Sequence, residues 1–307
     1  TYEDWEEGSP LLHEVMKKNE DKHFHIDDLS EDLQKYYRLQ TDDKKDATPV
    51  YMQHWKKKFS KFNLLLGKFK ILAKSIKDRT VLNKILNYFK KLKNNLKKEY
   101  TTLEIKADLN KKFIYVPLNF QPERTTSPQG DVFVDQILMI EILAASLPDG
   151  WAVYVKEHPS QWWLRGGIMY SCNRYPGYYN KIASIKGVQL VPINTNSFDL
   201  IHHSQAVTTV TGTAGWEAIV RSKPTLIFGY PWYRDFSKLF RIKDTESCKQ
   251  ALQKIERGFA VDQQDVINFL KSFDEATIHA YVEGFVDKIS KLNKQESMDN
   301  ISKIIFE

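Results

Sequence analysis

The chain has 307 residues, which is enough for one large domain or two modest ones, and its apolar share of 42% supports a hydrophobic core. Charged residues make up 27% of the chain, and no window of about 18 residues is apolar and free of charge, which argues against a membrane-spanning helix. The sequence does not open on a secretory signal, and Cys172 and Cys248 lack the spacing of a metal site. We therefore expect a cytoplasmic protein. The one further location we consider is peripheral, at the inner face of the cytoplasmic membrane.

The positive charge is concentrated in one segment. Residues 56–98 hold fifteen Lys or Arg against a single acid, Asp78, so the rest of the chain sums to about −8 although the whole carries +6. Apolar residues recur at helical spacing within this segment, as at Phe62, Leu65 and Phe69, which predicts two amphipathic helices that break near 78–80.

Three interpretations of the basic helices remain open. The interpretation we favour most is that the helices pack against a domain and expose lysine-rich faces. The second is that the helices of 56–98 contact an anionic membrane surface. Nucleic-acid binding comes last, because Phe59, Phe62 and Tyr88 fall in the apolar stripe and have the pattern of packing residues.

From Lys111 onward, short apolar runs alternate with helical patterns. This alternation predicts an α/β fold with a Rossmann-like parallel sheet covered by helices on both faces. The expected strands are 113–118, 152–157, 188–192, 206–210 and 224–229, and the expected helices are 132–147, 178–186, 197–203 and 215–221. Residues 244–307 have a helical pattern throughout, and residues 1–50 show helical hints around 27–39 without a strand.

Polar residues follow two of the predicted strands. Glu123 lies in the long polar loop after the first strand, where a carboxylate can act as base, nucleophile or ligand to a sugar hydroxyl; an exposed loop glutamate is the other interpretation. His158 follows the second strand, and Pro159 holds it extended, so that it can donate to a phosphate oxygen while Lys156 adds charge. A histidine that merely ends the strand is the alternative.

The third loop of interest follows the strand at 206–210, and its composition suits the binding of a phosphate. Thr211, Gly212 and Thr213 can surround a phosphate with hydroxyl and backbone N–H groups before the next helix, and Glu217 lies one turn into that helix. From there Glu217 can reach a ribose or sugar hydroxyl. Because the loops that carry His158 and Thr211 leave the same edge of one predicted sheet, the two are expected to form one site. A plain capped turn of small residues is the alternative.

Several motifs together resemble the capsule polysaccharide biosynthesis family of bacterial surface-carbohydrate enzymes, which includes retaining transferases of β-linked 3-deoxy-D-manno-oct-2-ulosonic acid (Kdo). The matching stretches are FIYVPL (113–118), QPERTTSPQG (121–130), FVDQ (133–136), VKEHPSQ (155–161), TNSF (195–198), VTGTAGWEA (210–218) and FGYPWY (228–233). They span about residues 111–245.

The resemblance implies a glycosyltransferase of GT-B architecture, with this Rossmann-like unit as its C-terminal, donor-binding half. It implies a nucleotide-sugar donor, CMP-Kdo, and a glycan or glycolipid acceptor of capsule or lipopolysaccharide synthesis. His158, with Thr211 and Thr213, would hold the CMP phosphate, and Gln121 belongs to the Gln-x-Glu motif in which Glu123 would be the catalytic carboxylate. The motif leaves open whether Glu123 is nucleophile or acid/base.

The chain departs from the family in one respect. A complete GT-B enzyme has a second Rossmann domain before the first matching strand, whereas residues 1–110 have a helical pattern here. We expect a mainly helical region at 1–110 on the interdomain or acceptor side, the donor-binding domain at 111–245, and helices that pack on it at 246–307. No cofactor is expected beyond the donor itself, and no metal, because no Asp-x-Asp pair occurs in a donor-site loop.

Two other functions stay open. A UDP-sugar transferase or polyol-phosphate polymerase of GT-B type would differ in its nucleotide or product. A non-catalytic scaffold module of an assembly complex would be indifferent to the replacement of Glu123 by Gln, which would inactivate an enzyme.

Overall fold

The computed structural model describes residues 8–42, 96–121, 126–159, 174–281 and 292–306, together with residues 69, 73–74, 76–78, 80–82, 161, 164–165 and 168–169. The chain divides into two compact units, one formed by Thr1–Asp42 with Asp262–Glu307 and the other by Asp43–Val261. The domain boundaries that the sequence suggested, near residues 110 and 246, stay a prediction.

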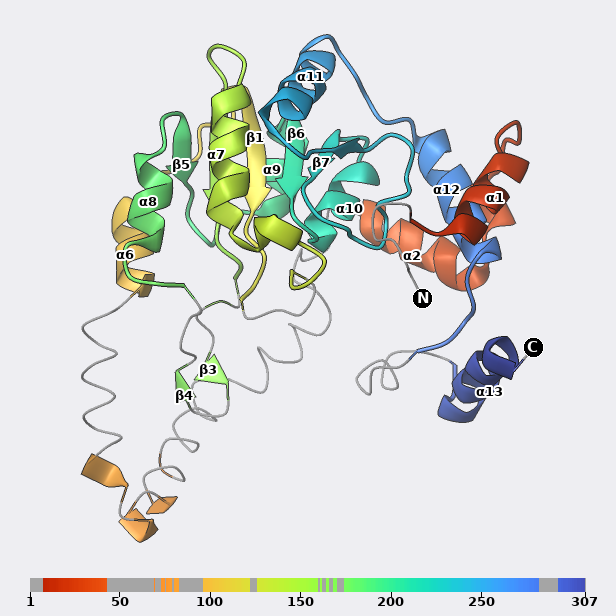
Figure 1. The fold of residues 1–307 in the computed structure, drawn as a ribbon, viewed down its shortest axis with the longest axis horizontal. Helices are drawn as coiled ribbons and strands as arrows, with labels where there is room; N and C mark the ends of the chain where they lie inside the picture. Colours follow the sequence, from red (N-terminus) through yellow and green to blue (C-terminus); the bar gives the residue numbers. More distant parts are fainter. Residues whose placement is uncertain are drawn as a thin grey trace. The chain divides into compact units, whose positions relative to one another are not determined.

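The larger unit is built on a six-stranded parallel sheet (Figure 1). Its strands are β1 (Phe113–Pro117), β2 (Ala152–Lys156), β5 (Val188–Leu190), β6 (Ala206–Thr209), β7 (Thr225–Ile227) and β8 (Phe240–Arg241). The order across the sheet is β5-β2-β1-β6-β7-β8, so the chain builds outward from β1 in one direction and then restarts at β6 in the other. This is the strand order of a Rossmann-like fold, and its switch point lies between β1 and β6. The α/β fold class expected from the sequence is confirmed.

Helices cover both faces of this sheet. One face packs against α6 (Leu96–Leu103), α7 (Gln136–Ser146), α8 (Tyr178–Ser184) and α11 (Thr245–Glu256), and the other against α9 (Ser197–His203) and α10 (Thr213–Ile219). Alternate residues of β1 serve the two cores: Ile114 faces the first, whereas Tyr115 faces the second. Each fully buried aliphatic side chain such as Ile114 contributes roughly 1.5–3 kcal/mol to the stability of the folded state, relative to leaving it exposed to water.

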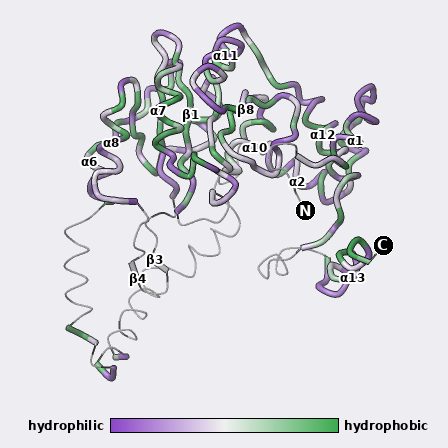
Figure 2. Tube along the Cα trace, in the orientation of Figure 1, coloured by the Kyte–Doolittle hydropathy of each residue, from purple (hydrophilic) through white to green (hydrophobic). Residues whose placement is uncertain are grey.

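Helix α7 shows why the sequence pattern predicted a buried helix. Most of its residues are apolar, as the green trace in Figure 2 shows, and Ile137, Ile140 and Leu143 at helical spacing are fully buried against the sheet. The carboxylate of Asp135 caps its first turn by accepting from the backbone N–H of Ile137 at 3.1 Å. The helix therefore begins at Gln136, four residues later than expected, because a separate 3-10 turn, η2 (Asp131–Val134), precedes it.

Two short features escaped the sequence pattern. Strand β8 has two residues, too few to show any periodicity, and joins the sheet by pairing with β7. A small antiparallel pair, β3 (Leu164–Arg165) with β4 (Ile168–Met169), lies within the connection from β2 to α8.

The smaller unit is helical. It contains α1 (Pro10–Lys18), the 3-10 turn η1 (Ile26–Asp28), α2 (Glu31–Thr41), α12 (Gln263–Glu275) and α13 (Lys294–Phe306). Side chains along α12 fasten the segment after α1: Gln264 donates to the carbonyl of Phe24 at 2.8 Å, and Asn268 donates to that of Lys22 at 2.9 Å. The two ends of the chain are therefore tied together by side chain to backbone hydrogen bonds.

Candidate functional site

The loops that carry the predicted site residues leave one edge of the sheet. Strands β1 and β2 run in parallel with Pro117 opposite Lys156, and β1 also pairs with β6. The loops after these three strands therefore emerge together at the switch point, where open α/β sheets bind their ligands.

The turn after β6 is tightly organised. The backbone N–H of Gly212 donates to the Thr209 hydroxyl at 3.1 Å, and the Tyr233 hydroxyl donates to the Gly212 carbonyl at 2.6 Å. A Cβ on Gly212 would lie 2.7 Å from the Thr209 Oγ1, and one on Gly215 would lie 2.2 Å from the Tyr233 Oη. Both glycines are therefore required by close approach, and the turn cannot be filled by larger residues.

Asn119 joins the end of β1 to this turn. Its side-chain nitrogen donates to the Thr211 hydroxyl at 3.3 Å, and its side-chain oxygen accepts from the Thr209 hydroxyl at 3.4 Å. Thr211 is buried, and Thr213, which begins α10, is exposed. Asn119 and Thr209 were not predicted as site residues, although Asn119 directly follows the first strand, a position that could have drawn attention to it.

The loop after β1 is held by a pair of glutamines. Gln121 donates its backbone N–H to the side chain of Gln161 at 2.9 Å, and Gln161 donates in return to the Gln121 carbonyl at 2.7 Å. The side chain of Gln121 donates to Thr126 at 2.7 Å. These bonds anchor the start of the loop that carries Glu123, which lies outside the described residues.

His158 is partly exposed at the end of β2. Its backbone N–H donates to the Glu157 carboxylate at 2.6 Å, and its carbonyl accepts from the Gln161 N–H at 2.9 Å. The imidazole packs against Phe120, with ring centroids 5.6 Å apart. Because Phe120 follows Asn119, the contacts run continuously from His158 through the β1 loop to Thr211. The structure therefore brings these two predicted residues to one edge of the sheet.

Beneath His158 lies a buried ion pair that the sequence did not suggest. The Arg174 guanidinium contacts the fully buried Glu157 carboxylate at 3.2 Å, and the Tyr179 hydroxyl donates to the same carboxylate at 2.6 Å. Arg174 also donates to the Asn119 carbonyl at 2.9 Å. Burial opposes the charge on Arg174, but the carboxylate outweighs burial and raises the pKa of the guanidinium. The pair ties the ends of β1 and β2 together.

Lys156 points to the opposite face of the sheet. It is 4% exposed, and its ammonium donates to the Thr195 carbonyl at 2.6 Å and to the Ser197 hydroxyl at 2.7 Å. Burial lowers the pKa of Lys156 to about 8, although the nearby Glu217 carboxylate works against this. The hydrogen bonds of the ammonium thus go to neutral protein groups at the start of α9. A contact between Lys156 and a nucleotide-sugar donor stays a prediction.

Glu217 lies partly buried on α10. Burial raises the pKa of its carboxyl, while Arg221 and Lys156 act in the opposite direction. Arg221 donates to the Glu217 carbonyl at 3.0 Å and stacks on the Phe198 ring at 4.0 Å. Lys156 and Glu217 therefore belong to a polar cluster on the α9 and α10 face, while Glu157 lies on the α8 face.

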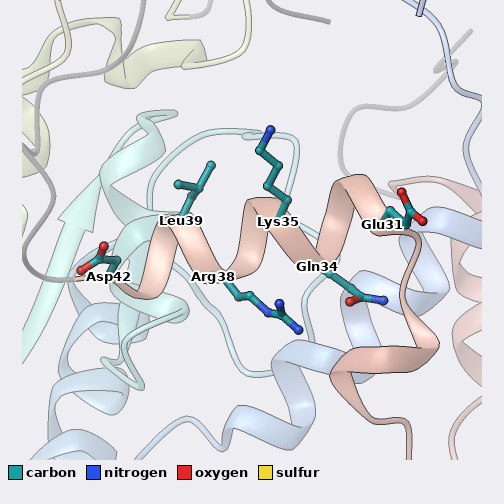
Figure 3. A pocket seen from close by; sticks show the side chains of 6 residues that line it. All are labelled: Glu31, Gln34, Lys35, Arg38, Leu39 and Asp42. Atoms are coloured by element: carbon teal, nitrogen blue, oxygen red, sulfur yellow. The ribbon is translucent and has the colours of Figure 1, made fainter. Parts of the chain in front are cut away.

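A separate hollow of about 340 Å³ lies in the smaller unit (Figure 3). The described residues that line it lie on α2 or directly after it: Glu31, Gln34, Lys35, Arg38, Leu39 and Asp42. None of the predicted site residues that the structure describes lines it.

The part of the chain that the structure describes contains no group of three or more His, Cys, Asp or Glu residues placed to hold a metal ion. Among the described helices, none combines the length and the apolar character that crossing a bilayer requires. Within the basic segment, most residues of 56–98 lie outside the described ones; Phe69, Ile76 and Leu82 are described and exposed. Membrane contact through this segment stays a prediction.

The strand order and the convergence of polar loops define a Rossmann-like α/β domain with its candidate ligand edge at the switch point. Residues 34–237 match the model of a family described as "Capsule polysaccharide biosynthesis protein". This match covers more than half of the chain, so the chain belongs to the capsule polysaccharide biosynthesis family. The family resemblance expected from the sequence motifs is confirmed.

Individual relatives cover smaller parts. The capsule polysaccharide modification protein LipA of Neisseria meningitidis serogroup B is 31% identical over 81 residues, which are 26% of this chain and 10% of LipA. This chain therefore matches only about a tenth of that relative's length.

Parts of two solved structures are similar to parts of this chain. The Thermosulfurimonas dismutans KpsC, a beta Kdo 2,7 transferase, is 18% identical with a TM-score of 0.37, and the match covers 54% of this chain and 46% of KpsC. A Staphylococcus aureus MnaA structure with UDP is 16% identical with a TM-score of 0.34, and the match covers 60% of this chain and 47% of MnaA.

Proposed function

We propose that this chain is the donor-binding half of a GT-B glycosyltransferase of capsule or lipopolysaccharide synthesis. In this proposal it transfers a sugar, Kdo, from a CMP-linked donor to a glycan or glycolipid acceptor. The observation that carries the proposal is the convergence of the loops after β1, β2 and β6 at the switch point, in a chain that belongs to the capsule polysaccharide biosynthesis family.

The chemistry of these loops suits a phosphate. His158 offers a partly exposed imidazole, and Thr211 and the exposed Thr213 offer hydroxyls; the N–H of Gly212 holds the turn by donating to Thr209. In sugar transfer the bond between the anomeric carbon and the phosphate oxygen breaks, and the nucleotide phosphate leaves with additional negative charge. Hydrogen-bond donors fixed in advance around that phosphate would stabilise the charge as it develops.

The remaining predicted residues take roles that follow from the family motifs. Glu123 would be the catalytic carboxylate, and the glutamine pair that anchors Gln121 would fix the start of its loop. Glu217 would bind a ribose or sugar hydroxyl. Lys156 would act on the donor through its charge, since its ammonium already has protein acceptors.

Titration calorimetry with CMP, UDP and ADP tests the proposal. We expect CMP to bind most tightly, and His158→Ala to weaken CMP by about tenfold or more, because a hydrogen bond to a charged phosphate is lost. Replacement of the exposed His203, which lies on α9 and bonds to the Asp199 carbonyl, provides a matched control that should leave the affinity for CMP unchanged.

Other outcomes distinguish the alternatives. No binding of any nucleotide at millimolar concentration would contradict the donor site and favour a scaffold module. A preference for UDP would instead indicate a UDP-sugar transferase, and a phosphate-containing product would indicate a polyol-phosphate polymerase.

A further inference from the structure

A continuous series of hydrogen bonds leads from the β6 turn to Thr211. It starts at the backbone N–H of Gly212, which donates to the Thr209 hydroxyl at 3.1 Å. Thr209 donates to the side-chain oxygen of Asn119 at 3.4 Å, and the side-chain nitrogen of Asn119 donates to the Thr211 hydroxyl oxygen at 3.3 Å. All three side chains are buried, with exposures of 0% for Thr209, 6% for Asn119 and 8% for Thr211.

The direction of this series is fixed by its first member. A backbone N–H can only donate, so the Thr209 oxygen accepts from Gly212 and its own proton is directed to another acceptor, the Asn119 oxygen. That contact sets the orientation of the Asn119 amide, whose nitrogen then faces Thr211. Because Thr211 accepts from Asn119, its hydroxyl proton points away from Asn119 and is available to an acceptor beyond the series. Neighbouring hydrogen bonds of one direction also polarise one another.

Asn119 is itself held from both sides. Its backbone N–H donates to the Gln136 side chain at 2.7 Å, and its carbonyl accepts from Gln136 at 3.3 Å and from Arg174 at 2.9 Å. The backbone of Asn119 is thereby anchored to α7 and to the buried ion pair with Glu157. Its side chain is left to connect Thr209 with Thr211.

We propose that Asn119 is a positioning residue that aims the hydroxyl proton of Thr211 at the phosphate of the donor. This rests on the proposed function, because it takes the phosphate to lie beside Thr211. The residue acts through Thr211 and needs no contact with the ligand, so its effect on binding should depend on the Thr211 hydroxyl. Such a dependence separates positioning from a general loss of structure.

The test is a double-mutant cycle with Asn119→Asp and Thr211→Val, read out as the affinity for CMP by calorimetry. An aspartate at this position has the same shape but only accepts, so the Thr211 hydroxyl would turn back towards it and be lost to the ligand. We expect N119D to weaken CMP by about tenfold more in the wild-type background than in the T211V background, where only repulsion between the new charge and the phosphate remains. Asn119→Leu, which adds no charge, should show a smaller loss that is likewise absent in the T211V background.

Thr208→Val provides the matched control. Thr208 neighbours Thr209 on β6 and its hydroxyl is buried, but it has no hydrogen-bond partner among the described residues, so CMP affinity should not change. Thermal unfolding of each variant identifies any that fail to fold, and N119L replaces N119D in the cycle if the charged variant does.

The outcomes separate this proposal from the proposed function. The positioning role would be overturned if N119D, and likewise N119L, weakened CMP binding as much in the T211V background as in the wild type. It would also be overturned if neither Asn119 variant changed the affinity for CMP while T211V still weakened it. If T211V and His158→Ala both left CMP binding intact, the proposed donor site would be wrong, and the positioning role with it.

Discussion

Lys156 and Glu157 are neighbours in the sequence and both are buried, but they are stabilised in different ways. Glu157 faces the α8 side of the sheet, where Arg174 supplies an opposite charge at 3.2 Å and Tyr179 a hydrogen bond at 2.6 Å. Lys156 faces the α9 side, where its close partners are a carbonyl and a hydroxyl, both neutral. The alternation of a strand places these two charges in separate environments.

The difference shows what each environment costs. A guanidinium in contact with a buried carboxylate compensates its charge, and removal of one member leaves an uncompensated buried charge. A buried ammonium with dipolar partners retains part of its desolvation cost, which explains why the pKa of Lys156 falls to about 8. We therefore expect mutation to affect the two positions differently, and the Lys156 ammonium to make stability depend on pH.

The largest effect should come from breaking the ion pair. Arg174→Met leaves the Glu157 carboxylate buried without its counter-charge, and we expect a loss of about 3–5 kcal/mol in the free energy of unfolding, measured by urea denaturation. The double variant with Glu157→Gln should recover a large part of this loss, because no charge then remains. A loss below about 1 kcal/mol for R174M would contradict this, because the pair would then contribute no more to stability than an exposed ion pair does.

A smaller effect, with a distinct pH dependence, is expected at Lys156. Its pKa in the folded protein, about 8, lies below its ordinary value of 10.5, so between these two pH values the unfolded chain binds a proton that the folded chain does not. Stability therefore rises with pH across this window. We expect the wild type to gain roughly 2 kcal/mol relative to Lys156→Met between pH 7 and pH 10.

Urea denaturation of both proteins at the two pH values measures this gain. The K156M variant is the reference, and the comparison is repeated with Glu217→Gln in both proteins, because Lys156 lowers the pKa of that carboxyl and its removal changes it. A constant difference between the two proteins would mean that the ammonium is solvated, and the contrast with Glu157 would disappear.

A third effect, of similar size or smaller, is expected on β6, where side chains alternate between the two faces in the same way. Thr208 and Thr209 are both fully buried on opposite faces, but only Thr209 has hydrogen-bond partners among the described residues, Gly212 and Asn119. Thr209→Val should cost about 1–3 kcal/mol because it leaves these two groups unsatisfied, whereas Thr208→Val should be neutral or slightly stabilising. Thermal unfolding of the pair checks this, and equal shifts in Tm would contradict it.

Local patterns account for the parts of the fold that were predicted correctly. The run FIYVPL is apolar on both sides of its pleat because β1 is covered on both faces, and α7 shows its helical spacing over a full stretch of buried residues. The two-residue strand β8 could not be predicted, because its place in the sheet depends on pairing with β7 and not on its own pattern.

The site was predictable to the same extent. His158, Thr211 and Gly212 follow strands that the sequence shows, so their meeting at one edge could be expected. Asn119 follows the first strand and could have drawn attention, but its role, like those of Thr209 and Arg174, depends on partners that are distant in the sequence. Asn119 lies 92 residues from Thr211, and Arg174 lies 55 residues from Asn119. A polar residue in isolation does not indicate which distant group will satisfy it.

The sequence by itself determined the alternation of strands and helices, the parallel sheet and the loops that carry the candidate chemistry, because these follow from periodicity and from residue type over short distances. Only the tertiary structure decided the order of the strands, and hence that β1 and β6 flank the switch point. It also decided which buried charge has a counter-charge in direct contact and which has neutral hydrogen-bond partners. Strand order and burial depend on packing between segments far apart in the chain, and no local pattern contains that information.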